Sequence, residues 1–215
     1  MVRDVIANKN SMATKQKRFV YVSNLMNGTV DINKCIFIDE SGINSWIRRT
    51  FGRSTVGTRC YKQWPSYRGN NTSLCMAISK NGIIHHKIRN GAFNRNAFQE
   101  FMVELEAVVG DEEINFVVDN CSIHYDIYLD YDNHQLIYLP PYSPILNPIE
   151  TLFSVLKSKI KENIGQKSEI QRHQNLSKII EDVIMSMRSL DLTSHYRHSM
   201  SFHSACINKI DILGG

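Results

Sequence analysis

The stretch that decides the fold is Leu139-Pro140-Pro141-Tyr142-Ser143-Pro144-Ile145-Leu146-Asn147-Pro148-Ile149-Glu150, which follows the apolar run Gln135–Leu139. Its four prolines restrict the chain to extended and turn conformations until a helix begins. Asn147 suits a helix N-cap and Pro148 the first helical position, so Glu150 is predicted to lie in the first turn. The sequence therefore predicts a strand that leads through a rigid connector into a helix, with an acid at the crossing.

Two other acids follow apolar runs of strand length. Asp39 follows Cys35–Ile38, and Asp119 follows Ile114–Val118. Short, nearly continuous apolar runs are typical of strands that are buried on both faces. We therefore expect Asp39 and Asp119 at strand ends, where Glu150 could join them.

Composition fits one compact α/β domain, with tails or a small appendage. The chain has 215 residues, of which 42% are hydrophobic and 21% are charged. It has no apolar run of about 18 residues and no signal-peptide core, so the sequence predicts neither a membrane protein nor a secreted one. The five cysteines are scattered and form no CxxC pair, which favours a reduced compartment, the cytosol or the nucleus.

The chain is expected to have three parts: an N-terminal tail and lead-in at 1–33, an α/β domain at 34–165 and a helical C-terminal extension at 166–215. The short basic run Lys15–Arg18 in the first part is expected to be solvated. Hydrophobic periodicity and turn residues predict the following elements: a strand at Cys35–Asp39, a hairpin of Ser73–Ser79 and Ile83–Ile88, a helix from Asn94 to Gly110, a strand at Ile114–Val118, a weak helix at Ser122–Asp132, a strand at Gln135–Leu139, and helices at Pro148–Gly165 and Leu176–Leu190.

A long basic stretch lies between the first two predicted strands. No Asp or Glu occurs from Ser41 to Gln99, and 41–71 reads as a functional loop in which aromatic and basic residues alternate. This composition suits stacking on bases and pairing with phosphates. The alternative is that the aromatic residues anchor the loop while its arginines are solvated. The candidate DNA-binding residues are Arg48, Arg49, Arg53, Arg59, Lys62 and Arg68.

Three converging carboxylates suit phosphodiester cleavage with two metal ions about 4 Å apart. Mg²⁺ fits because it binds few carboxylates and accepts phosphate oxygens. Asp39 would bridge both ions, while Asp119 and Glu150 would each hold one. Each acid also has a local explanation: Glu150 could complete a capping box, and the two aspartates could form turns.

Several histidines and one amide are weaker candidates. Asn120 and His124 follow Asp119 closely and could assist the site, although a lone histidine is more often a packing residue. A further set has spacing that superficially resembles zinc ligands, but helical spacing explains it equally well and the paired ligand signature is missing. That set is His195, His198, His203 and Cys206.

Three segments resemble the motifs of the Tc1/mariner and IS630-type transposases: 37–42 (FIDESG), 118–120 with His124, and 139–150. The resemblance covers about 34–164. It implies an RNase H-like mixed sheet flanked by helices, a DDE triad of Asp39, Asp119 and Glu150, and two Mg²⁺ or Mn²⁺ ions. It also implies hydrolysis and strand transfer at transposon ends. The loop after Asp39 resembles the family's clamp, which implies contacts with DNA and with a second subunit of a homodimer.

The family pattern differs from this sequence in two places. Members carry helix-turn-helix domains before the catalytic part, and 1–33 has no room for them, so a truncated transposase is expected, nuclear in a eukaryote and otherwise cytoplasmic. The spacing from Asp119 to Glu150 is about one helical turn shorter than in the family, and the missing residues are expected after His124. Two alternatives stay open: a non-enzymatic DNA-binding or assembly module, and an RNase H-type hydrolase of RNA–DNA hybrids.

Overall fold

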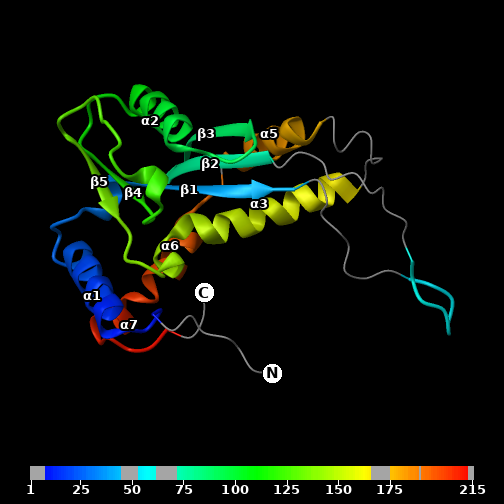
Figure 1. The fold of residues 1–215 in the computed structure, drawn as a ribbon, viewed down its shortest axis with the longest axis horizontal. Helices are drawn as coiled ribbons and strands as arrows, with labels where there is room; N and C mark the ends of the chain where they lie inside the picture. Colours follow the sequence, from blue (N-terminus) through cyan, green and yellow to red (C-terminus); the bar gives the residue numbers. More distant parts are fainter. Residues whose placement is uncertain (1–7, 45–52, 62–71, 166–174, 189, 213–215) are drawn as a thin grey trace.

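A five-stranded mixed sheet forms the centre of the molecule (Figure 1). The computed structural model describes residues 8–44, 53–61, 72–165, 175–188 and 190–212. The strands lie in the order β3-β2-β1-β4-β5, with β1, β4 and β5 parallel and β2 and β3 antiparallel to their neighbours. Their bounds are β1 Cys35–Ile43, β2 Thr72–Ser79, β3 Gly82–Asn90, β4 Ile114–Val118 and β5 His134–Tyr138.

Helices cover both faces of this sheet (Figure 1). Helix α2 (Arg95–Val109) covers one face; it is capped by Asn94, whose side chain accepts a hydrogen bond from Ala97 N, and it ends at Gly110 with φ 72°. Helices α3 (Pro148–Gly165) and α5 (Leu176–Met187) cover the other face. The predicted RNase H-like mixed sheet between helices is confirmed.

Helix α3 carries a continuous apolar stripe into the larger core. Its inward residues recur with the period of an α-helix, so one face packs beneath the sheet. Full burial of one such side chain stabilises the fold by about 1.5–3 kcal/mol. The stripe consists of Ile149, Leu152, Phe153, Leu156, Ile160 and Ile164, all at most 3% exposed.

The N-terminal segment forms a helix that the sequence did not predict. Helix α1 (Met12–Met26) begins at the N-cap Ser11, whose hydroxyl accepts a hydrogen bond from Thr14 N. Two of its inward positions, Thr14 and Arg18, are polar. The hydrophobic residues of this segment therefore do not recur with a helical period. The expectation that the basic run is solvated is wrong for Arg18, whose residue is 1% exposed.

The two ends of the described chain pack against each other. Helix α7 (His203–Ile207) contacts α1, and Asn10 exchanges two hydrogen bonds with the backbone of Ile212. Lys15 and Asp211 form an ion pair on the surface of this contact. Helix α6 (Thr193–Met200), which precedes α7, lies against α3.

The structure corrects the predicted elements at two places. The weak helix predicted at Ser122–Asp132 is only a single 3₁₀ turn, Ser122–His124, after which the chain is irregular. The first residues of the predicted loop, 41–43, extend β1, while 53–61 lie outside the sheet and are exposed. None of the helices in the described ranges is long and apolar enough to cross a bilayer.

Candidate functional site

Strand pairing brings Asp39 and Asp119 to the same edge of the sheet. β1 and β4 are parallel, with Cys35 opposite Asn115 and Phe37 opposite Val117. Continuation of this register past the end of β4 places Asp39 level with Asp119, one strand spacing of about 4.8 Å away. Asp119 is therefore at the carboxyl end of a strand, as predicted, whereas Asp39 lies inside β1.

The proline-rich connector brings Glu150 to the same place. It leaves β5 at Leu139, whose N–H donates to Val118 O at 2.8 Å, and passes through a 3₁₀ turn, Pro144–Leu146, into α3. The Asn147 N–H donates to Pro144 O at 2.9 Å, so Glu150 does not act as a capping-box acid. Glu150 lies in the first turn of α3, as the sequence predicted.

These three acids line one open pocket of about 510 Å³. Asn120 and Cys121, which follow Asp119, lie on its wall, together with the connector from Leu139 to Pro144. Asn147 lies there too and donates from Nδ2 to Asp39 Oδ2 at 3.1 Å. The pocket therefore gathers the predicted triad, and the connector that positions Glu150 is also a wall of the pocket.

Negative charge accumulates around Asp39. Burial, followed by the carboxylates of Glu150 and Glu40, raises the pKa of Asp39 to about 8. Burial is also the main cause that raises the pKa of Glu150, with a smaller contribution from Asp119. Such a site stabilises a nearby positive charge, because a cation would relieve the repulsion between these carboxylates.

The surroundings of Asp119 lower its pKa instead of raising it, because His124 bonds to its carboxylate. His124 Nδ1 lies 2.8 Å from Asp119 Oδ1, and its Nε2 lies 3.1 Å from Glu40 Oε1. The hydrogen bond from His124 lowers the pKa of Asp119. Burial alone would lower the pKa of His124, but its bonds to Asp119 and Glu40 raise it to about 10.

The imidazole of His124 is fully buried, and its ring lies 4.3 Å from that of Phe98 in α2. His124 therefore connects the face of the sheet that α2 covers to a carboxylate of the pocket. Glu40, its second partner, points to that face because successive side chains of a strand alternate. The predicted auxiliary residues Asn120 and His124 thus both lie next to the triad.

The donor set suits Mg²⁺ or Mn²⁺, since it consists of hard carboxylate oxygens on an open pocket. Among the described residues, no three His, Cys, Asp or Glu side chains are close enough to form a metal site by themselves. An arrangement in which substrate oxygens complete the coordination is the usual one for Mg²⁺, which binds through one or two carboxylates.

The predicted DNA-binding residues are described only in part. Arg53 and Arg59 lie on the exposed segment 53–61, in which Ser54 Oγ donates to Thr58 O at 2.7 Å. The other four, Arg48, Arg49, Lys62 and Arg68, lie outside the described residues.

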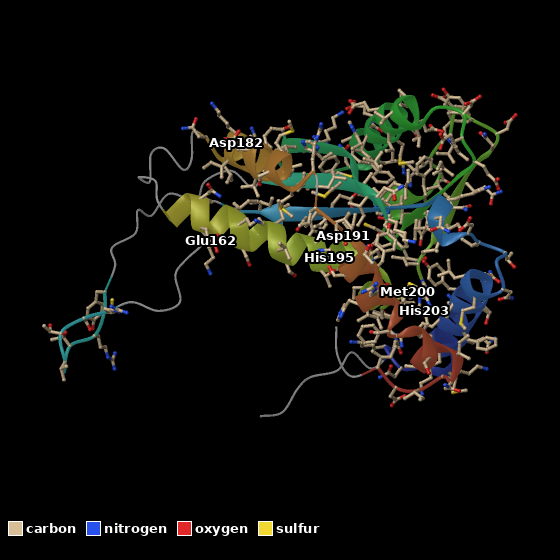
Figure 2. All side chains as sticks on the ribbon, turned by 180° about the vertical axis from the view of Figure 1, so that it is seen from behind. Glu162, Asp182, Asp191, His195, Met200 and His203 are labelled. Atoms are coloured by element: carbon tan, nitrogen blue, oxygen red, sulfur yellow. The ribbon has the colours of Figure 1, made fainter. Side chains whose placement is uncertain are left out.

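The histidines with zinc-like spacing come from two different helices. Figure 2 shows His195 in α6 beside the start of α3, and His203 at the start of α7. His195 Nδ1 lies 2.7 Å from Thr151 Oγ1, and the ring of His198 packs edge-on against Phe202.

The sequence did not predict that Glu40 and Asn147 act as hydrogen-bond partners in the site. Glu40 is not among the predicted site residues, although its alternation with Asp39 along a strand places it on the opposite face. The sequence predicts Asn147 only as a helix cap. Its bond to Asp39 crosses 108 positions of sequence, and no local pattern predicts it.

The chain matches a known protein family and is similar to several solved structures. The family model described as "DDE superfamily endonuclease" matches residues 34–171. A paired-end complex of Mos1 transposase with the left transposon end has a TM-score of 0.74 at 15% identity, covering 96% of this chain and 63% of that one. No curated protein matches.

Two further structures show how much of each Mos1 chain this chain covers. The mariner Mos1 paired-end complex with Mg has a TM-score of 0.75 at 15% identity, covering 100% of this chain and 67% of that chain. The isolated catalytic domain of Mos1 mariner transposase has a TM-score of 0.63 at 14% identity, covering 99% of both chains. The chain thus spans about two thirds of the longer Mos1 chains and nearly all of the isolated domain.

Proposed function

The chain belongs to the DDE superfamily endonucleases, and from this premise we propose that it is a metal-dependent transposase catalytic unit that cleaves DNA phosphodiesters and transfers strands at transposon ends. The observation that carries the proposal is the pocket that Asp39, Asp119 and Glu150 line together. These residues are far apart in sequence, and the sheet and the connector bring them to one edge.

The roles of the three acids follow from their surroundings. Asp39 is the most buried of the three, and the carboxylates of both Glu150 and Asp119 act on its pKa, so Asp39 would be the ligand that two ions share. Asp119 and Glu150 would each hold one ion. Bound Mg²⁺ or Mn²⁺ activates the attacking oxygen and stabilises the leaving one during phosphodiester cleavage.

The chain's other residues orient these acids. Asn147 holds Asp39 Oδ2, and the Glu40 N–H donates to the other oxygen of Asp39 at 2.8 Å. His124 and the Cys121 N–H both donate to Asp119 Oδ1. Carboxylates fixed in this way lose little freedom when a substrate phosphate arrives, which favours catalysis by positioning.

The partners that we propose are DNA and a second copy of the chain. The basic set in the loop after Asp39, with Arg53 and Arg59 exposed, would contact the phosphates of transposon ends and target DNA. The same loop would contact the second subunit. The similar Mos1 structures include a paired-end complex with the left transposon end and a strand transfer complex, which supports DNA as a partner.

A second candidate is a transposase-derived DNA-binding or assembly module without catalysis. One observation favours it: within the described part of the chain, the acids do not form a three-ligand group. In that case the pocket would contain the three acids but would not bind the metal ions in a geometry that allows phosphodiester cleavage.

Plasmid nicking separates the two functions. Supercoiled plasmid is incubated with the chain and Mg²⁺, Mn²⁺ or EDTA, beside Asp119→Asn and the matched control Glu162→Gln. Figure 2 shows Glu162 toward the far end of α3, away from the pocket at the start of that helix. Comparison with an RNA–DNA hybrid tests whether the substrate is instead that of an RNase H-type enzyme.

The catalytic proposal expects nicking by the wild type and by Glu162→Gln in either metal, none in EDTA, and a loss of about 100-fold or more in Asp119→Asn. DNA binding without nicking in all of these conditions would leave the assembly module. Equal nicking by Asp119→Asn and the wild type would place the activity outside this pocket.

A further inference from the structure

Among the residues that the structure describes, Arg18 is the largest polar side chain that is fully buried, and it contacts the connector across the fold. The residue is 1% exposed. Its Nε donates to Ser143 Oγ at 2.8 Å, and its NH2 donates to Tyr142 O at 2.7 Å. Its NH1 donates to Asn10 Oδ1 at 3.3 Å. All three acceptors are uncharged oxygens, so hydrogen bonds, and not an ion pair, satisfy the buried guanidinium.

These bonds hold a strained turn. Tyr142 has φ 52°, a left-handed conformation that L residues with large side chains rarely adopt. Such a residue persists only where its surroundings fix it. The Ser143 hydroxyl, which accepts from Arg18, donates in turn to Pro141 O at 2.9 Å. Arg18 thus contacts Tyr142 and Ser143 directly and reaches Pro141 through that hydroxyl.

The strained turn is also part of the pocket. Pro141, Tyr142 and Ser143 lie on the pocket wall together with Glu150 and Asn147. The 3₁₀ turn that follows them keeps the chain short and stiff up to α3, with Leu146 N donating to Ser143 O at 3.0 Å. A shift at Tyr142 would therefore move the start of α3 and its acid.

We propose that Arg18 is a positioning residue of the site: by fixing the turn at Tyr142 and Ser143, it sets where Asn147 and Glu150 enter the pocket. This inference rests on the proposed function, because it assigns Arg18 to the same site. Under this proposal α1 supports the geometry of the site. The C-terminal segment contributes as well, because Asn10 bonds to both Arg18 and the backbone of Ile212.

Arginine is specifically suited to this position. Its planar fork donates from Nε and NH2 in directions that two acceptors can share, whereas a lysine ammonium is a single point on a flexible stem. Arg18→Lys therefore keeps the charge but cannot reproduce both bonds. Ser143→Ala is a smaller change that removes only the Nε acceptor and the bond to Pro141.

The matched control is Lys15→Gln on the same helix. Lys15 pairs with Asp211 at the contact between the chain ends, and its side chain is 16% exposed. This change disturbs the packing of α1 without touching the connector. A purely structural role for Arg18 would make its variants behave like the control, with a lower Tm and an unchanged site.

The first measurement is hydrogen exchange at the amides of Leu146 and Asn147 in the metal-free protein. Both amides bond within the connector, and their exchange reports its stiffness without any activity. Exchange about tenfold faster in Arg18→Lys and Ser143→Ala than in Lys15→Gln is expected. Equal exchange in all three variants would overturn the inference, whether or not the chain cleaves DNA.

The second measurement is the rate of plasmid nicking as a function of Mn²⁺ concentration. We expect Arg18→Lys to be about 10-fold to 100-fold slower and to need more Mn²⁺ for half-maximal rate, with unchanged DNA affinity. Adding Tyr142→Gly, which removes the strain at φ 52°, should restore part of the rate. A wild type that does not nick contradicts the proposed function, and the exchange result then decides the role of Arg18.

If the wild type nicks DNA and Arg18→Lys and Ser143→Ala nick as fast as Lys15→Gln, the assignment of Arg18 to the site is overturned. Should Arg18→Lys fail to fold, Ser143→Ala carries both measurements, because it leaves the buried guanidinium in place.

Discussion

His124 Nδ1 lies 2.8 Å from Asp119 Oδ1, and the same imidazole reaches Glu40 with its other nitrogen at 3.1 Å. One buried ring thus connects an acid of the pocket to an acid on the opposite face of the sheet. The residue that orients Asp119 is fully buried, so a substrate does not need to contact it. Residues that orient metal-binding carboxylates in this way are known to affect both metal affinity and activity.

His124→Gln is therefore expected to lower the nicking rate by about 10-fold to 100-fold. Glutamine cannot donate to Asp119 and Glu40 at the same time with the geometry of a rigid ring. Initial rates at saturating Mg²⁺ measure the effect. The matched control is His85→Gln in β3, whose imidazole bonds to Glu104 of α2 and does not line the pocket. Equal rates for both variants would show that Asp119 needs no such support.

Asn147→Asp tests the contact between the connector and Asp39. The aspartate can still accept from Ile149 N, as Asn147 Oδ1 does at 3.3 Å, so the start of α3 should keep its cap. It cannot donate to Asp39 and instead adds a negative charge beside it. At pH 8 without metal we expect a lower Tm, because the added carboxylate repels Asp39, and with metal we expect nicking per folded molecule reduced at least about tenfold. A fall in Tm with full activity per folded molecule would contradict this role.

Removal of Asp39, the most buried of the three pocket acids, should stabilise the metal-free protein. The pKa of Asp39 is raised from 3.8 to about 8 by burial and by Glu150 and Glu40. Its ionisation therefore disfavours the folded state, with a penalty that is absent below pH 4 and grows until pH 8. In EDTA, Asp39→Asn should be more stable than the wild type by about 1–3 kcal/mol at pH 8 and about equally stable at pH 4.

Urea unfolding at the two pH values measures this difference. Added Mg²⁺ should stabilise the wild type and leave Asp39→Asn unchanged, because only the folded wild type gains a ligand. A difference in stability that does not vary with pH would show that Asp39 ionises freely in the folded state.

A second buried pair stabilises the opposite end of the sheet. Glu106 Oε1 lies 2.7 Å from His134 Nδ1, and both carboxylate oxygens accept from Asp130 N at 3.1 Å. Glu106→Ala should lower the free energy of unfolding by about 3 kcal/mol, since it leaves buried partners unbonded. Nicking at low temperature should persist, because His134 begins β5 while the pocket lies beyond its other end. Glu112→Ala, at an exposed position, is the control for thermal unfolding.

The sequence predicted those parts of the fold that depend on local patterns. The strand Ile114–Val118 and the helix starting at Pro148 occur where apolar period and proline placement put them. The end of β4 and the start of α3 meet at one edge of the sheet, where the sequence pattern places Asp119 and Glu150. Asp39 lies at the same edge but inside β1, because that strand continues to Ile43.

Long-range polar contacts could not be predicted in the same way. Helix α1 was missed because its inward face contains Arg18 and Thr14, whose burial depends on partners elsewhere in the chain. The bridge from His124 to Glu40 joins residues 84 positions apart. Such contacts depend on the completed fold, and a single sequence carries no periodic signal for them.

The gathering of three acids around shared metal ions is the central claim, and anomalous scattering from a crystal soaked in Mn²⁺ tests it most directly. We expect a peak between Asp39 and Asp119, with Glu150 on the same side of the pocket, and no peak in crystals of Asp39→Asn. A wild-type map without density at this position, or with Mn²⁺ bound only elsewhere, would contradict the claim.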